Sequence, residues 1–255
     1  MKSYKVVGAG PHKVLLFPGL LGTSSSFDTM LDYSSKDRFQ YVVPDYRGYG
    51  ESRNEPGLFT LREAVIDAVR LVEYLGWTHF SVAGHSLGAL VAQMVAVALP
   101  SRVSAIVMIA GLSARGAVSG PAREQFMKVA AETREGRAAL VRAGVVSRYS
   151  EAATREISDR SFTSISEAAF KGYAMDSSRT DISSAVSSLN CPVLALVGQH
   201  DPNATEKAAR ETTMSFYGNA TLVVLDGAGH YPMAEVPMNT VSAVENFLSG
   251  VNAAR

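Results

Sequence analysis

Six short apolar runs recur along this 255-residue chain, and a glycine, proline or aspartate follows each within two residues. The runs occupy residues 14–17, 41–43, 80–83, 106–109, 193–197 and 222–225. They are almost continuously apolar rather than alternating, which is typical of strands covered on both faces of a parallel sheet. Helical patterns lie between most of them. The sequence therefore predicts an α/β fold with a doubly wound, mostly parallel sheet.

The clearest helical signal begins at Thr60. Thr60 and Glu63 form a capping box, in which the threonine caps the helix and the glutamate reaches back to it. Apolar residues then recur at helical spacing, and Gly76 is placed to end the helix. A second helix is expected over residues 87–99; it is apolar on most sides, which indicates that it is buried, and Pro100 stops it.

Residues 112–188 break this alternation, because they contain no convincing buried strand and are rich in Ala, Ser, Arg and Glu. Their helical runs are at 122–132, 138–146 and 152–160, with apolar residues spaced for amphipathic helices. An insertion of this length between two strands is either a separate helical layer or a lid. We expect residues 1–111 and 189–255 to form the core that carries the sheet, and residues 112–188 to form a helical cap.

The composition excludes several classes of protein. The 24 Lys and Arg residues balance 24 Asp and Glu residues, whereas a phosphate backbone selects for an excess of basic residues. One cysteine cannot form an internal disulfide. No apolar window reaches the roughly 20 residues that cross a bilayer, and the start lacks the apolar stretch of a signal peptide. We therefore expect a cytoplasmic monomer or homodimer that binds neither nucleic acid nor membrane.

Residues 84–88 read Gly-His-Ser-Leu-Gly and fit G-x-S-x-G, the nucleophile elbow. They lie between an expected strand and an expected helix. Such a sharp turn strains the backbone of Ser86 and presents its hydroxyl at the carboxyl edge of the sheet, while the glycines leave room for the tight approach. The amide of Leu87 then stands at a helix start, where it can donate to a developing oxyanion. An ordinary tight turn is the other interpretation, but this context favours a nucleophilic serine.

Four segments, in this order along the chain, resemble motifs of the α/β-hydrolase family. They are the D-x-R-G-x-G-x-S turn at 45–52, the elbow at 84–88, the acid loop at 197–202, and the histidine loop at 227–232 with Glu235 and Pro237. The similarity covers nearly the whole chain and places residues 112–188 where this family has its cap domain. It implies an α/β-hydrolase fold and a Ser-Asp-His triad.

A serine hydroxyl is a weak nucleophile and needs an adjacent base. Of the five histidines, His230 lies in a glycine-rich loop after a strand, where an imidazole can reach Ser86, and it fits the chain order of the triad. His85 neighbours the serine, but the elbow turns successive side chains apart, so we expect a packing residue. Of the remaining three, His12 lies before any loop at the active edge of the sheet. His79 precedes its strand and so lies at the opposite edge, and His200 lies beside the candidate acid.

The base in turn needs an acid to orient it. Asp201 lies in the loop after the strand at 193–197 and is the expected acid. Asp45 and Asp226 also end strands, but we expect the first to anchor a loop and the second to belong to the strand end. A buried Asp201 that is bonded to the far imidazole nitrogen would fix the tautomer of His230.

The second oxyanion donor is expected in the loop after the strand at 14–17. Aligned with the family's H-G-x pattern, Leu20 supplies the backbone amide, and Pro18 stands in place of the histidine that normally orders this loop. A second departure lies near the N-terminus, where one short strand at 4–7 precedes the strand at 14–17 and relatives often have two. The sequence contains no zinc or phosphate-loop motif, so we expect no metal and no cofactor.

The leading interpretation is a serine hydrolase that cleaves a small or medium, largely apolar carboxylic ester or lactone through an acyl-enzyme. The same triad also serves hydrolysis of a carbon–carbon bond in ring-cleavage products, acyl transfer, thioester hydrolysis and perhydrolysis. A small-molecule receptor that kept the triad, and a cofactor-free oxygenase on this scaffold, stay open. Dehalogenases and epoxide hydrolases are disfavoured, because they carry Asp where this chain has Ser86.

The insertion suggests what kind of substrate enters. We expect its apolar side chains to face the elbow and form an apolar slot. The candidate pocket residues are Phe126, Met127, Val145, Val146, Tyr149 and Tyr173. No Lys/Arg cluster selects a strongly anionic substrate, although two isolated arginines, Arg115 and Arg123, are able to.

Overall fold

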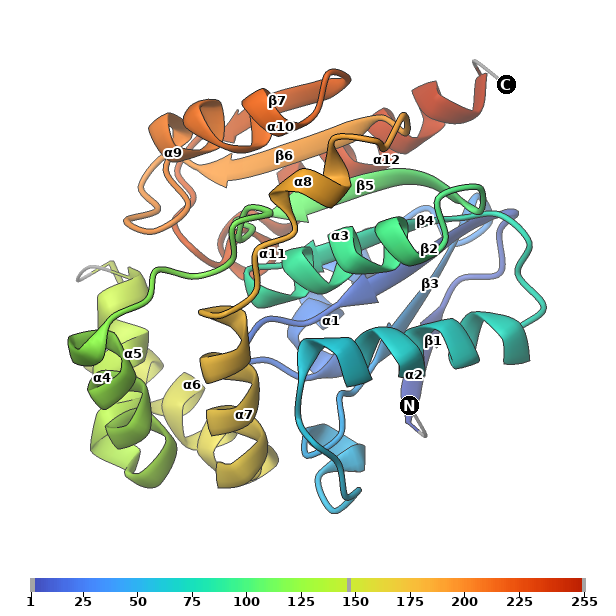
Figure 1. Ribbon diagram of the computed structural model, residues 1–255. Coiled ribbons are helices and arrows are strands. Elements are labelled where there is room, and N and C mark those ends of the chain that lie inside the picture. Colours follow the sequence, from blue (N-terminus) through green and yellow to red (C-terminus); the bar gives the residue numbers. More distant parts are fainter. Residues whose placement is uncertain (1–2, 146–147, 254–255) are drawn as a thin grey trace.

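The computed structural model describes residues 3–145 and 148–253, and a seven-stranded sheet runs through its centre (Figure 1). The strands are β1 (Tyr4–Val7), β2 (His12–Phe17), β3 (Phe39–Pro44), β4 (Phe80–His85), β5 (Val103–Ile109), β6 (Val193–Gly198) and β7 (Ala220–Leu225). Their order in the sheet is β1-β3-β2-β4-β5-β6-β7, with β1 antiparallel to β3 and every other pair parallel. The predicted mostly parallel sheet is confirmed, and all six apolar runs lie in its strands.

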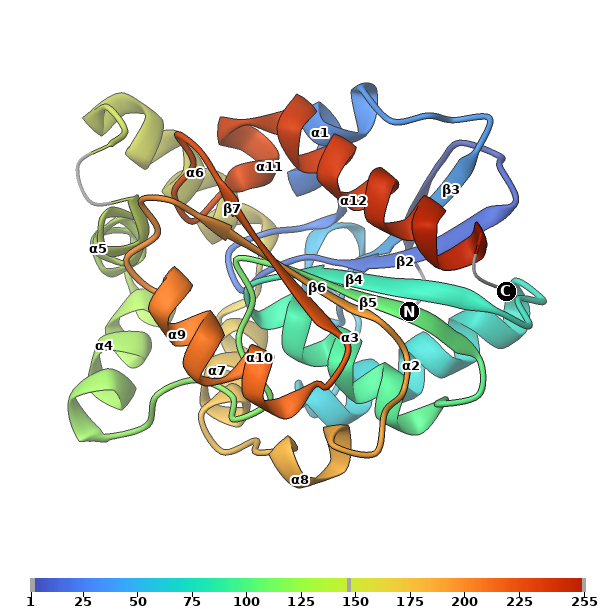
Figure 2. The same cartoon turned by 90° about the horizontal axis from the view of Figure 1, so that it is seen from above.

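Helices cover both faces of the sheet, as Figure 2 shows, so the predicted doubly wound arrangement is also confirmed. One side carries α1 (Asp28–Asp32), α11 (Pro232–Glu235) and α12 (Pro237–Ala253). The other side carries α2 (Leu61–Tyr74), α3 (Leu87–Ala98), α8 (Ser183–Val186), α9 (Glu206–Glu211) and α10 (Thr213–Phe216). Short 3-10 helices occupy Ser24–Phe27 and Gly50–Ser52.

Side chains that alternate along the strands divide the core into two clusters. In β2, Leu15 and Phe17 pack toward α2 and α3, whereas Val14 and Leu16 pack toward α12. All four are fully buried. Strands buried on both faces need apolar residues at every position, which is why these runs do not alternate in sequence.

The capping box at the start of α2 forms, but Glu63 accepts its hydrogen bond from a different amide than expected. Thr60 caps the helix and its Oγ1 accepts a hydrogen bond from the amide of Glu63 at 3.2 Å, as predicted. The Glu63 carboxylate, however, accepts from the amide of Phe59 at 3.0 Å. Phe59 has a φ of 54°, so a left-handed residue leads into the cap. Gly76, with a φ of 65°, ends the helical segment as expected.

The insertion between β5 and β6 contains four longer helices that lie beside the carboxyl ends of the strands (Figure 1). They are α4 (Pro121–Glu132), α5 (Arg134–Val145), α6 (Glu151–Ser164) and α7 (Glu167–Ser177). The three helical runs expected here fall within α4, α5 and α6, except that Val146 lies outside the described residues. Within the described ranges, no helix is long and apolar enough to cross a membrane.

Candidate active site

The elbow has the strained geometry that its sequence predicts. β4 ends at His85, α3 begins at Leu87, and Ser86 between them has φ 51° and ψ −115°. A Cβ atom on Gly84 would lie 2.1 Å from the carbonyl oxygen of Gly88, so no larger residue fits there. Strain of this kind, over-determined by its surroundings, is common at functional sites.

Ser86 forms one end of a hydrogen-bonded chain of three side chains. His230 Nε2 lies 3.2 Å from Ser86 Oγ, and His230 Nδ1 lies 2.8 Å from Asp201 Oδ2. The other carboxylate oxygen of Asp201 accepts from the amides of Asn203 and Ala204 at 2.8 and 3.1 Å. The three residues favoured from the sequence are therefore brought together in the order that nucleophile, base and acid require.

Two opposing effects act on the pKa of Asp201. Burial of the side chain, which is 0% exposed, would by itself raise the pKa of this carboxyl. The hydrogen bond and charge of His230, together with the amides of Asn203 and Ala204, outweigh burial and hold the pKa of Asp201 below its ordinary value. Asp201 is therefore ionised at neutral pH and is able to orient His230.

A second carboxylate holds the backbone around the candidate base. Glu235, in α11, accepts hydrogen bonds from the amides of Gly229 and Tyr231 at 2.8 and 3.0 Å, on either side of His230. Arg148, after α5, pairs with Glu235 at 3.3 Å and so connects the insertion to this loop. The sequence marks Glu235 as part of the histidine loop but does not reveal which amides it binds.

His85 does more than the packing expected of it. Its Nε2 donates to the carbonyl oxygen of His230 at 2.7 Å. Burial, reinforced by the nearby charge of His230, lowers the pKa of His85 to about 3, so the ring is neutral at physiological pH. Because a carbonyl only accepts, the single proton of the neutral ring resides on Nε2.

The loop after β2 is ordered by tyrosines in place of the missing histidine. The hydroxyl of Tyr46 donates to the carbonyl of Pro18, and the hydroxyl of Tyr49 donates to the carbonyl of Leu20, both at 3.0 Å. Both tyrosines are buried. The sequence contains these residues in its D-x-R-G-x-G-x-S segment, but nothing local shows that their hydroxyls reach across to this loop.

Asp45 anchors the same region, as expected from the sequence. It is 1% exposed and accepts hydrogen bonds from the amides of Ser24 and Glu51 at 2.7 and 3.2 Å. Asp45 thus connects the segment after the Leu20 loop to the turn at 45–52. The acid that is hydrogen-bonded to His230 Nδ1 is Asp201, and Asp45 instead holds backbone amides.

A cavity of about 600 Å³ opens at Ser86. Ser86, His230 and Leu20 line it on the side of the sheet. The insertion supplies apolar side chains from α4, α5 and α6 and from the segment between α5 and α6. They include Met127, Leu140, Tyr149 and Ile157. Of the six candidate pocket residues, Met127 and Tyr149 are therefore in the lining.

Three other candidate pocket residues do not line this cavity. Tyr173 is fully buried in an aromatic cluster, with its ring centroid 5.3 Å from that of Tyr46 and 5.6 Å from that of Tyr49. Its helix, α7, packs against α4 and, to a smaller extent, against α2. Phe126 packs against the core cluster below α2 and α3, and Val145 is buried within the insertion. Val146 lies outside the described residues.

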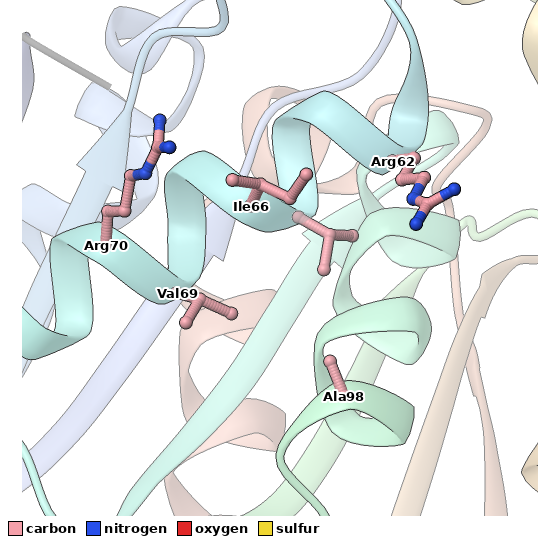
Figure 3. Close-up of a pocket in the computed structure, with 6 residues that line it drawn as sticks. Arg62, Ile66, Val69, Arg70 and Ala98 are labelled. Atoms are coloured by element: carbon pink, nitrogen blue, oxygen red, sulfur yellow. The ribbon is translucent and has the colours of Figure 1, made fainter.

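A separate groove lies on the outer surface of α2 and α3 (Figure 3). The close-up shows Arg62 and Arg70 at its two ends, with Ile66 and Val69 between them and Ala98 of α3 opposite. The described residues that line it include no nucleophile, whereas Ser86 and His230 line the other cavity. In the described part of the chain, no group of three or more His, Cys, Asp or Glu residues is placed to hold a metal ion.

Comparison with known proteins finds relatives of similar sequence. Serine hydrolase BPHL of Mus musculus is 38% identical over 110 residues, which are 41% of this chain and 38% of that protein. The matched region thus spans well under half of that relative. 3-Oxoadipate enol-lactonase 2 of Acinetobacter baylyi is 24% identical over 98% of this chain and 94% of its own length.

Solved structures are similar to this chain in fold. A thermophilic esterase from Thermogutta terrifontis superposes with a TM-score of 0.80 at 25% identity, over 98% of this chain and 93% of that chain. The model of the alpha/beta hydrolase family matches residues 14–244, which include the elbow, the acid loop and the histidine loop. The chain belongs to the alpha/beta hydrolase family.

Proposed function

We propose that this hydrolase cleaves a small or medium, largely apolar carboxylic ester or lactone, with Ser86 as nucleophile, His230 as base and Asp201 as the orienting acid. The observation that carries the proposal is the hydrogen-bonded chain Ser86–His230–Asp201 at the opening of the cavity. Relatives named as an enol-lactonase and as an esterase support this substrate class. The cavity volume suits a substrate of this size.

In the first half of the reaction, Ser86 Oγ attacks the carbonyl carbon while His230 Nε2 takes the hydroxyl proton. The carbonyl oxygen becomes an oxyanion, and the amides of Leu20 and Leu87 are the proposed donors to it. Leu87 begins α3, so the helix dipole also favours the negative charge. The bond to the alcohol oxygen then breaks, and the alcohol leaves with the proton from His230.

In the second half, water attacks the acyl group on Ser86 and gives a proton to His230. The bond to Ser86 Oγ breaks, the proton returns to the serine, and the carboxylic acid departs. A lactone follows the same path, except that its alcohol stays attached to the acyl group. Asp201 is ionised throughout and stabilises the imidazolium that forms in each half.

The helices of residues 112–188 act as a cap in this proposal. Their apolar side chains cover the cavity, which favours short soluble esters and lactones over long-chain triglycerides. Faster hydrolysis of triglycerides than of short soluble esters would contradict this assignment of the pocket.

The test is a panel of short esters, lactones, thioesters and vinylogous diketones, assayed with wild type and with Ser86→Ala. We expect turnover of esters or lactones that Ser86→Ala loses, and labelling of Ser86 by a fluorophosphonate. Exclusive turnover of the diketones would assign carbon–carbon hydrolysis. Binding without turnover would assign a receptor, and oxygen uptake that persists in Ser86→Ala would assign an oxygenase.

A further inference from the structure

The cavity at Ser86 carries one cation that the described part of the chain leaves unpaired. Arg123 lies in the first turn of α4 and lines the cavity, as does Met127 one helical turn later. The Arg123 side chain is half-buried. Its Nε atom is buried and finds no hydrogen-bond acceptor among the described residues, and no carboxylate there forms an ion pair with it.

The other charged groups around the cavity do not neutralise the Arg123 guanidinium. Arg160, in α6, is the second arginine of the lining, and it is paired with Glu156 at 2.7 Å. No Asp or Glu is among the described residues that line the cavity. Arg115, the other isolated arginine noted in the sequence, lies over the ring of Phe216 at 5.2 Å and is not in the lining. The unpaired charge at this site is therefore that of Arg123.

Burial without a partner destabilises the charged form of a side chain. Burial lowers the pKa of the Arg123 guanidinium, and no charge on the residues that the structure describes counteracts that effect. An anion that enters the cavity would offset the lost hydration by forming charge-assisted hydrogen bonds. One guanidinium in an otherwise largely apolar lining matches a single negative charge, which fits a carboxylate better than a phosphate dianion.

We infer that Arg123 is a specificity residue that binds a carboxylate of the substrate, so that the preferred ester or lactone carries one free carboxylate besides the acyl group that Ser86 attacks. This inference rests on the proposed function. It narrows the substrate class from apolar acyl compounds to their mono-carboxylate derivatives.

The test compares the monoethyl esters of succinic, glutaric and adipic acid with the corresponding diethyl esters, in wild type, Arg123→Met and Arg123→Lys. We expect wild type to prefer at least one monoester about tenfold in kcat/KM. Arg123→Met should lower kcat/KM for that monoester by about 10- to 100-fold, mainly through KM, and change the diethyl ester by less than about threefold. Arg123→Lys should retain part of the preference, because it keeps the charge.

The matched control is Arg155→Met, because Arg155 is an exposed arginine of α6, pairs with Glu151 and does not line the cavity. It should leave both ester classes unchanged. Equal losses for monoester and diester in Arg123→Met, or no loss for the monoester, would overturn the inference. Turnover of the diesters that depends on Ser86 but shows no preference for a free carboxylate overturns the inference alone and leaves the hydrolase proposal standing.

A binding measurement keeps the test independent of turnover. Calorimetry with succinate, glutarate and adipate is run on Ser86→Ala and on Ser86→Ala/Arg123→Met. Binding of one of them that the second substitution weakens at least tenfold supports the inference even where no ester is cleaved. Binding that is equal in the two variants, or absent from both, contradicts it.

Discussion

Asp201 illustrates how a single residue acquires its function from opposing influences. Its complete burial favours the neutral acid, and three hydrogen bonds favour the ionised carboxylate. The hydrogen bonds outweigh burial and lower the pKa of Asp201, so a negative charge lies beside His230 Nδ1. A charge in this place selects the tautomer of His230 whose Nε2 is free to accept the proton of Ser86.

Asp201→Asn should therefore lower kcat/KM by about 10³- to 10⁴-fold while leaving the fold intact, because a neutral amide no longer selects that tautomer. The measurement is ester hydrolysis at neutral pH, with circular dichroism to verify folding. Asp226→Asn is the matched control, since Asp226 is exposed at the end of β7 and should be replaceable at no cost to activity. Comparable losses in both variants would contradict the assignment of Asp201.

His85 leads to a prediction about pH. Because the pKa of His85 is lowered to about 3, the ring stays neutral as the pH falls from 8 to 5, and its donation to the His230 carbonyl is unaffected. His85→Phe, which removes the donor, should lower kcat about tenfold, whereas His85→Gln should lose less. Neither should move the midpoint of the acid limb of kcat/KM. A displaced midpoint in both variants would show that His85 itself titrates in that limb.

At the scale of elements, the tyrosines of the 45–52 turn connect the loop after β2 to the insertion. The ring of Tyr49 packs edge-to-face on Tyr173 of α7, and its hydroxyl holds the Leu20 carbonyl. The proposed oxyanion donor therefore depends on the packing of a helix far away in sequence. Order in this loop is set by tertiary contacts rather than by the residue at position 18.

Tyr49→Phe should lower kcat about three- to tenfold with a smaller change in KM, because the Leu20 loop loses one hydrogen bond and the oxyanion amide is held less firmly. Steady-state kinetics with one soluble ester measures both constants. A loss that appears entirely in KM would indicate a role in substrate binding instead.

Tyr173→Phe supplies the matched comparison within the same cluster. The hydroxyl of Tyr173 is buried and has no hydrogen-bond partner among the described residues. Its removal should leave kcat unchanged and raise the free energy of unfolding by about 1 kcal/mol, since an unpaired buried hydroxyl destabilises the fold. Chemical denaturation measures the change; a loss of stability would show that the hydroxyl has a partner.

The same elements show what sequence can and cannot predict. The elbow and the triad follow from local order, because a strand, a tight turn and a helix place Ser86 at the sheet edge wherever they occur. The capping-box pattern predicts that Glu63 bonds to the amide of Thr60, but it bonds to the amide of Phe59, whose left-handed backbone leads into the helix. The sequence does not show that Tyr173 lies outside the cavity lining, because its ring packs against Tyr46 and Tyr49, which are distant in sequence.

At the scale of the whole molecule, the insertion and the sheet share one of the two core clusters. The apolar cluster beneath α2 and α3 includes Met127, Phe170 and Tyr173 of the insertion together with Leu15 and Val82 of the sheet. Residues in one contiguous core lose their packing together. The insertion is therefore expected to be stabilised by the sheet rather than to fold on its own.

We accordingly predict one cooperative thermal transition for the full chain, with equal calorimetric and van't Hoff enthalpies. Differential scanning calorimetry measures both, and Phe170→Ala should lower the single midpoint without dividing the transition, at a cost of about 3–5 kcal/mol. Two resolved transitions in wild type would contradict a shared core.

In the proposed reaction, Ser86 carries the acyl group between the two halves. The most direct measurement is rapid acid quench of the enzyme with a short activated ester, followed by mass spectrometry of the peptide that contains Ser86. We predict an acyl adduct on Ser86 that forms within the first turnover, disappears as substrate is consumed, and is absent from Ser86→Ala. Hydrolysis that continues in Ser86→Ala, or an adduct on a different residue, would contradict it.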